Sequence, residues 1–242
     1  MMDSQCRYFR WTNKAVVKNS CSDCAAYRVC AFKGGTAPVC SVLDSMIEEE
    51  LYLEKGSVVC NSSQPARDLY AVRSGALKEC TIDRAGKERV IEFYFPGETV
   101  GLYALSQHTY RYCAISIEKS TVCRIPFDSL LERIKHMPRL QQNLLNMMSR
   151  QLFNRTLLNH FQSAEQQLAA FLITVSQRCA QLGQSSVPHW LGISRHDIAG
   201  YLQLTTETVC RVLTRFRQRG LITTDKKQIV IHKTAELAEL AS

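Results

Sequence analysis

Residues Thr205–Arg219 read TTETVCRVLTRFRQR, a stretch with the pattern of an amphipathic helix. Apolar side chains recur at intervals of three or four residues, as a single buried helix face requires; they are Val209, Val212, Leu213 and Phe216. The opposite face is polar and carries Thr206, Glu207, Cys210, Arg211 and Thr214. The Thr205 hydroxyl can accept a hydrogen bond from the first turn, so Thr205 suits an N-cap. The stretch predicts a helix that buries one side and presents the other to a partner.

The segments on either side complete the pattern of a winged helix-turn-helix. A shorter helix is expected over Arg195–Leu202 with Ser194 as its N-cap, followed by a tight turn at 203–205. Two strands, Leu221–Thr224 and Gln228–His232, are predicted to form a hairpin. In modules of this kind the second helix lies in the major groove of DNA, and its N-terminal residues reach base edges.

The polar face of the predicted recognition helix suits contacts with DNA. Arg211 can make two hydrogen bonds to guanine, and Glu207 can accept one from cytosine. The two residues are also four positions apart, so they can form a surface ion pair, which does not exclude base contacts. We expect Thr206 and Cys210 on the same DNA-facing surface. Phosphate contacts are expected from basic residues further along: Arg215, Arg217, Lys226 and Lys227.

The formal net charge of the chain is +8, and the positive excess is unevenly distributed. Between Thr205 and Lys233, seven Lys and Arg residues stand against two acidic ones, Glu207 and Asp225. A local excess of this kind attracts polyanions, of which DNA is the commonest. Charge alone fits a solvated surface equally well, and the helix pattern decides in favour of DNA.

The region from Leu51 to Pro126 has a β-rich pattern broken by turn signals such as Ser74-Gly75 and Pro96-Gly97. Seven strands are expected, over Val58–Val59, Asp68–Arg73, Ala76–Ile82, Glu88–Tyr94, Thr99–Val100, Tyr112–Ile117 and Thr121–Ile125. Closely spaced strands with glycine turns predict a small antiparallel barrel or roll.

Helices are expected after the β-rich region, over Phe127–Ile134, from Pro138 to about His160, and over Ala164–Ala180. The long second helix carries two adjoining apolar stripes, made by Leu140, Leu144, Met147, Met148, Leu152, Leu157 and Leu158. One stripe can cover the β-roll while the other meets a partner helix, or the helix can be buried wholly within its own domain. The pattern leaves both arrangements open.

Three of the eleven cysteines form a C-x2-C-x5-C run at Cys21, Cys24 and Cys30. Thiolates at this spacing can converge on one metal centre, with a fourth ligand from elsewhere in the chain. The run by itself fits either zinc or an iron–sulfur cluster. Some of the other cysteines can pack as small buried hydrophobic residues.

Two classes of protein are not expected from this sequence. It has no run of about 18 apolar residues and no apolar secretory signal in its first residues, so a membrane protein is not expected and a cytoplasmic location is. Its six His residues are scattered and no catalytic constellation is visible, so an enzyme is not expected.

From Cys21 to the C-terminus, the chain resembles the CRP/FNR family of bacterial transcription regulators, and within it the FNR type. Besides the cysteine run, the resemblance rests on LYAVRSG at 69–75, STVCRIPF at 120–127, AEQQLAAF at 164–171, DIAGYL at 197–202 and LTTETVCR at 204–211. It implies an α+β fold in which a cyclic-nucleotide-binding-like β-roll precedes a long dimerisation helix and a winged helix-turn-helix. The domain ranges expected are 1–35 for a cysteine-rich cluster-binding segment, 36–137 for the β-roll, 138–162 for the dimerisation helix and 163–242 for the DNA-binding domain.

The resemblance also implies a cofactor and a signal. FNR-type regulators hold an oxygen-labile [4Fe–4S] cluster, and the matching ligand positions are Cys21, Cys24, Cys30 and Cys123. Cys113 is a reserve candidate whose flanking residues do not match. With the cluster intact a homodimer binds a palindrome resembling TTGAT-N4-ATCAA, and in oxygen the dimer weakens and releases the DNA. Such a regulator activates or represses genes in the switch between aerobic and anaerobic growth. Other signals remain open: nitric oxide, haem or thiol redox, or a structural zinc site.

The sequence departs from the family pattern at several positions. FNR-type recognition helices read Glu-x-x-Ser-Arg, and here Cys210 replaces the serine, either as a tolerated substitution or as a second redox group. This leaves the outer base preference open. The turn at 83–87 matches a loop that contacts RNA polymerase in the family. Gly97-Glu98 matches part of a cyclic-nucleotide site, but Arg111 is followed by Tyr112 rather than Ser or Thr, so no cyclic nucleotide is expected.

Overall fold

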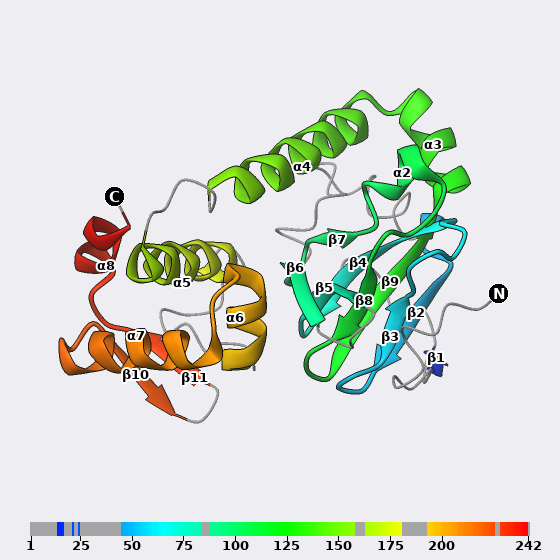
Figure 1. Ribbon diagram of the computed structural model, residues 1–242. Helices are drawn as coiled ribbons and strands as arrows, with labels where there is room; N and C mark the ends of the chain where they lie inside the picture. The colour runs from blue at the N-terminus through cyan, green and yellow to red at the C-terminus, as the bar shows by residue number, and fades with distance from the viewer. Residues whose placement is uncertain are drawn as a thin grey trace. The chain divides into compact units, whose positions relative to one another are not determined.

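The computed structural model describes residues 14–16, 21, 24, 45–83, 88–157, 163–180, 193–225 and 228–241. Contacts divide the chain into two compact units, Met1–Arg150 and Gln151–Ser242 (Figure 1). Each unit buries a core of its own. Within the described ranges, no helix combines the length and the apolar character that crossing a bilayer needs.

The first unit contains two antiparallel sheets (Figure 1), and side chains from both belong to one core. One sheet has the strand order β1 (Lys14–Val16), β2 (Glu49–Leu53), β9 (Ser120–Pro126), β4 (Asp68–Ser74) and β7 (Thr99–Val100). The other has the order β3 (Val58–Cys60), β8 (Cys113–Ser116), β5 (Leu77–Ile82) and β6 (Glu88–Tyr94). Leu51 and Val122 from the first sheet and Leu77 and Tyr94 from the second belong to one hydrophobic cluster. The predicted β-roll is confirmed.

All seven predicted strands are present, with small shifts at their ends, but β1 and β2 were not predicted. β1 is three residues long, too short for a periodic signal. β2 reads EELYL and breaks the expected alternation, because Glu50 is fully buried while Tyr52 is 41% exposed. A buried carboxylate is rare without a partner, and the partner of Glu50, Arg73, lies 23 positions away in the chain.

The first unit also contains α2 (Ala104–Gln107), α3 (Phe127–His136) and the start of α4 (Pro138–Leu157). α4 does carry two apolar stripes. Leu140 and Met147 are buried in the core of the β-roll, and Leu144 packs against it. The second stripe is exposed, with Leu145 at 55%, Met148 at 40% and Leu152 at 67%. The end predicted near His160 lies outside the described residues.

The second unit is helical with a short hairpin. It contains α5 (Ala164–Ala180), α6 (Arg195–Leu202), α7 (Thr206–Gln218), β10 (Ile222–Asp225), β11 (Gln228–Ile231) and α8 (Thr234–Leu240). α5 contacts both α7 and α8, and the rings of Phe171 and Tyr201 lie 5.5 Å apart in its core. α8 was not predicted; it is one short helix without a side-chain cap, anchored by the buried Leu237.

Gly75, in the turn between β4 and β5, is a position where we expect a large loss of stability on substitution. Its φ is +75°, and a Cβ there would lie 2.3 Å from Ser120 Oγ and 2.4 Å from the Lys119 carbonyl oxygen. Ser120 Oγ already accepts a hydrogen bond from the Ala76 N–H at 3.1 Å, so it cannot move away freely. Gly75→Ala should therefore lower the free energy of unfolding by about 3 kcal/mol or more.

Gly56 offers a matched control for this prediction. Its φ is +85°, but no atom lies within 4 Å of an added Cβ. Gly56→Ala should cost about 1 kcal/mol, from backbone strain alone. Urea unfolding of both variants measures the difference. Equal losses would contradict the proposed steric clash at Gly75.

Candidate functional site

α6 and α7 form a helix-turn-helix whose two caps are as predicted. Ser194 Oγ accepts the Asp197 N–H at 3.0 Å at the start of α6, and Thr205 Oγ1 accepts the Thr208 N–H at 3.1 Å at the start of α7. Between the helices, Gln203 takes a left-handed conformation with φ of +56°, which turns the chain sharply. The caps and the turn together set the direction in which α7 leaves α6.

α7 buries the face that the periodicity predicts and exposes the other. Val209, Val212, Leu213 and Phe216 are buried. All five predicted DNA-contacting residues are exposed on the remaining surface: Thr206, Glu207, Cys210, Arg211 and Arg215. Within this described helix no ion pair joins Glu207 to Arg211, so both side chains are available to a ligand.

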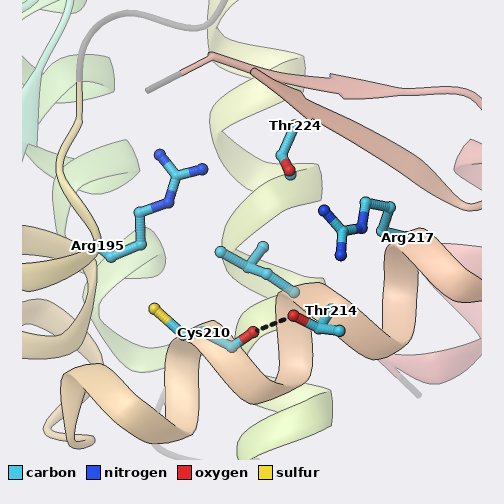
Figure 2. A pocket seen from close by; sticks show the side chains of 6 residues that line it. Arg195, Cys210, Thr214, Arg217 and Thr224 are labelled. Atoms are coloured by element: carbon cyan, nitrogen blue, oxygen red, sulfur yellow. Dashed lines mark hydrogen bonds between the residues drawn. The ribbon is translucent and has the colours of Figure 1, made fainter. Parts of the chain in front are cut away.

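A small pocket of about 130 Å³ lies beside Cys210 on this unit (Figure 2). Figure 2 shows Arg195 reaching it from the start of α6 and Thr224 from β10. Arg217, one helix turn beyond Thr214 on α7, completes the polar lining. The Thr214 hydroxyl donates to the Cys210 carbonyl at 2.9 Å, so it is held against its own helix. The pocket brings two guanidinium groups to the surface that also carries Cys210, a suitable place for an anionic group such as phosphate.

The cysteine site is built around the central strand of the five-stranded sheet. Cys123 lies on β9, directly opposite Glu50 on β2 and Ala71 on β4, and all three are buried. On the other side of β2, the register pairs Glu50 with Val16 of β1. Val16 therefore lies in the same row of the sheet as Glu50 and Cys123, and Cys21 follows Val16 by five residues.

Cys21 and Cys24 are half-buried, and Cys21 packs against the hydrophobic core that contains Cys123. The Cys24 N–H donates to the Cys21 carbonyl at 3.2 Å, which holds the two residues in a tight turn. Cys30, the third member of the run, lies outside the described residues. Three of the four predicted ligand residues are thus near the same part of the β-roll.

Arg73 is a cation that the described thiols influence electrostatically. Its Nη1 donates to Glu50 Oε1 at 2.6 Å. Burial acts to lower the pKa of the Arg73 guanidinium, whereas Cys24, Glu50, Cys123 and Cys21 raise it, and the pKa lies above its ordinary value. All three cysteines are therefore within electrostatic range of one guanidinium.

Cys113, the reserve candidate for the fourth ligand, lies in a different place. It is on β8 of the other sheet, in a small cluster with Val58 and Cys80. Its thiol donates to Asn61 Oδ1 at 3.1 Å. Within the described ranges, no three His, Cys, Asp or Glu side chains are arranged to hold a metal ion, so the described thiols share a neighbourhood without forming a closed site.

Known proteins resemble the chain over almost its whole length. A model of the cyclic nucleotide-binding domain matches residues 50–136, and a model of the Crp-like helix-turn-helix domain matches residues 166–240. The chain is 36% identical over 231 residues to the transcriptional activator protein Anr of Pseudomonas aeruginosa, covering 94% of this chain and 95% of that one. It is 34% identical over 224 residues to the fumarate and nitrate reduction regulatory protein of Escherichia coli K12, covering 91% and 90%. The chain belongs to the CRP/FNR family of transcription regulators.

A solved structure agrees with this fold. The regulator is similar to FixK2 from Bradyrhizobium japonicum, with a TM-score of 0.70 and 26% identity over 80% of this chain and 96% of that one. The predicted fold class, the DNA-binding helix-turn-helix and the absence of an enzyme activity are confirmed for this CRP/FNR regulator.

In the part of the regulator that matches a cyclic nucleotide-binding domain, Glu98 and Arg111 make hydrogen bonds within the protein. Glu98 Oε2 accepts the Phe95 N–H of its own turn at 2.9 Å. Arg111 is exposed, and its Nη2 donates to Gln107 Oε1 at 3.1 Å. That this CRP/FNR regulator binds no cyclic nucleotide stays a prediction.

One residue that lines the pocket beside Cys210, Arg195, was not singled out from the sequence. Arg195 lies beside Cys210 through the packing of α6 on α7, which no linear pattern reveals. Arg217 was expected to contact phosphate and lines the same pocket. Arg215 forms an ion pair with Glu165 of the second unit, with 3.7 Å between its Nη1 and Glu165 Oε2. The seven-residue spacing of Cys210 and Arg217, close to two helix turns, was the available signal for Arg217.

Proposed function

We propose that this regulator responds to oxygen through a [4Fe–4S] cluster held by Cys21, Cys24, Cys30 and Cys123. While the cluster is intact, a homodimer binds a palindromic promoter site and contacts RNA polymerase, and oxygen ends DNA binding. The observation that carries the proposal is the position of Cys123 on β9, within the core against which Cys21 packs. The name of the Escherichia coli relative concerns fumarate and nitrate reduction, which agrees with control of aerobic and anaerobic growth.

The donor set fits an iron–sulfur centre. Cysteine thiolates are the ligands that such clusters take, and those at Cys21, Cys24 and Cys123 are buried or half-buried, which limits access of water. When bound, the cluster would supply a thiolate-ligated centre that is sensitive to oxygen. The protein's part is to hold the N-terminal cysteines against β9, so that the loss of that contact changes the packing near α4.

The exposed face of α7 supports contacts of different residues with bases and with phosphate. Arg211 reads guanine and Glu207 reads cytosine in each half-site, since both are exposed on the first turns of the helix. Thr206 and Cys210 contact the neighbouring bases. Arg215 contacts phosphate, and its ion pair with Glu165 is then broken.

The exposed stripe of α4 supports the homodimer. Leu145, Met148 and Leu152 are spaced three and four residues apart on one side of the helix, and a second copy of the same stripe would bury them in a two-stranded packing. Leu152→Glu should place a charge in this seam and weaken the dimer by about 2 kcal/mol or more, roughly 30-fold. Sedimentation equilibrium without oxygen measures the change.

Asn146→Glu is the matched control for the dimer seam. Asn146 is exposed on the same helix, beside the stripe rather than within it. The control variant should keep the dimer affinity of the native chain within about threefold. Equal weakening by both variants would place the interface elsewhere.

DNA binding in two atmospheres tests the proposed function. Fluorescence anisotropy is measured with a labelled TTGAT-N4-ATCAA duplex and with a scrambled duplex of the same composition. We expect specific binding by protein prepared without oxygen, and loss of that specificity after exposure to air. Unchanged specific binding in air would refute oxygen control and leave the regulator with another signal.

A further inference from the structure

Arg73 and Glu50 form an ion pair that spans the strand carrying Cys123. β9 lies between β4 and β2 in the sheet, with Arg73 on β4 and Glu50 on β2. The 2.6 Å contact between Arg73 Nη1 and Glu50 Oε1 therefore passes over β9. It does so at the level of Cys123, because Cys123 is the residue paired with Glu50.

A bulge in β4 allows Arg73 to reach this position. Val72 pairs with Val122 and Ser74 pairs with Thr121, so Arg73 is the extra residue between two consecutive pairs. Bulges of this kind redirect one side chain and recur next to functional sites. The feature indicates that the direction of the Arg73 side chain is specifically set.

Stability alone does not account for the pair. The side chain of Glu50 is fully buried and that of Arg73 is 14% exposed. Removing two charges from water usually costs as much as their attraction returns, and an apolar pair of similar size is often as stable. The pair does, however, hold one guanidinium across the strand that carries Cys123, in the row of the sheet that pairs Cys123 with Glu50. Burial acts to lower the pKa of this guanidinium, while Cys24, Glu50, Cys123 and Cys21 act to raise it.

We infer that Arg73 is a positioning residue that supplies the counter-cation for the metal centre of the cysteine site, and that Glu50 holds it over Cys123. A centre with four thiolate ligands carries a net negative charge, whether it contains zinc or an iron–sulfur cluster. A fixed cation beside it stabilises the metal-bound, deprotonated thiolates and raises the reduction potential of a cluster. This inference rests on the proposed function for its iron–sulfur form.

The experiment compares variants that separate the cation from the buried carboxylate. Arg73→Met alone would remove the cation that pairs with the buried Glu50 carboxylate, which could unfold the unit. The informative pair is Glu50→Gln, which keeps the cation, and Glu50→Gln/Arg73→Met, which removes the cation together with the charge of the buried carboxylate. Arg73→Lys keeps a cation at the site. Thermal unfolding of each metal-free full chain establishes that it is folded.

Two readouts are measured on each variant. The first is the affinity of the metal-free full chain for Co²⁺, followed through thiolate-to-cobalt absorption. The second is the reduction midpoint potential of the protein purified without oxygen. We expect the double variant to bind Co²⁺ roughly tenfold or more weakly than Glu50→Gln and to show a lower midpoint potential, with Arg73→Lys close to the native chain.

The outcomes separate this inference from the proposed function. Equal Co²⁺ affinity and equal potential in Glu50→Gln and the double variant would overturn the inference, while a cluster in both would leave the proposed function intact. A native chain without iron whose Co²⁺ affinity depends on Arg73 would support the inference and refute the iron–sulfur proposal. A native chain that binds neither metal would overturn both.

Discussion

Cys123→Ser is expected to abolish cluster binding while leaving the β-roll folded. Serine is nearly the same size as cysteine, so the buried site on β9 keeps its packing, but a hydroxyl is a poor ligand for iron at neutral pH. The variant purified without oxygen should be colourless, with less than about a tenth of the iron and sulfide of the native chain. Far-UV circular dichroism should match the native protein.

Cys113→Ser is the matched control for this variant. Cys113 is also a buried thiol in a strand of the β-roll, and a serine hydroxyl can donate to Asn61 Oδ1 as the thiol does at 3.1 Å. This variant should keep its iron, its colour and its sensitivity to air. A cluster that survives Cys123→Ser and is lost in Cys113→Ser would exchange the two assignments.

Arg211→Ala should remove most of the sequence specificity of DNA binding. One bidentate contact with guanine contributes about 1–3 kcal/mol, and a dimer makes it twice, so the specific affinity should fall by about 2–6 kcal/mol, roughly 30-fold to 10⁴-fold. Weak binding to any duplex should persist, because other basic residues still attract phosphate. Competition between specific and scrambled duplexes at fixed salt measures the ratio.

Arg217→Ala is the control variant for Arg211→Ala. Arg217 lines the pocket beside Cys210 and we expect it to contact phosphate, so its loss should weaken binding to both duplexes alike and reduce the slope against salt by about one unit per subunit. Retained specificity in Arg211→Ala, together with lost specificity in Arg217→Ala, would reverse the roles of the two residues.

The second unit could be predicted almost to the residue, and the reason is physical. Helices with one apolar face and side-chain caps have signals that lie within a few positions of each other, as with Thr205 and Val209 in α7. The hairpin of β10 and β11 follows the same rule, because its strands are adjacent in the chain. α8 was not predicted, because a single short helix has too few positions to establish a period.

The first unit was harder to predict because its decisive contacts join residues that are distant in the sequence. β2 was missed because its buried Glu50 depends on Arg73, and Arg73 was not noticed because its position depends on a bulge in β4. The spacing of Cys21 and Cys24 predicted a ligand pair, whereas the pairing of β1 with β2, which brings Val16 to the row of Glu50 and Cys123, could not be read from the sequence. The choice of Cys123 over Cys113 came from the family resemblance.

The exposed face of α7 also was only partly predictable from the sequence. Its five predicted residues are exposed on α7, because the helical period determines which residues share a face. The cationic pocket beside Cys210 depends on Arg195 from another helix. Cys210, which replaces the family's serine, therefore lies near two guanidinium groups. The sequence pattern alone did not show this.

The most direct test of the oxygen-sensing account is the metal content of the chain purified without oxygen. Iron, zinc and acid-labile sulfide are measured per chain, together with the visible absorbance before and after exposure to air. The account predicts a brown protein with about four irons and about four sulfides per chain, which loses its colour in air. A colourless protein holding about one zinc ion per chain would contradict it.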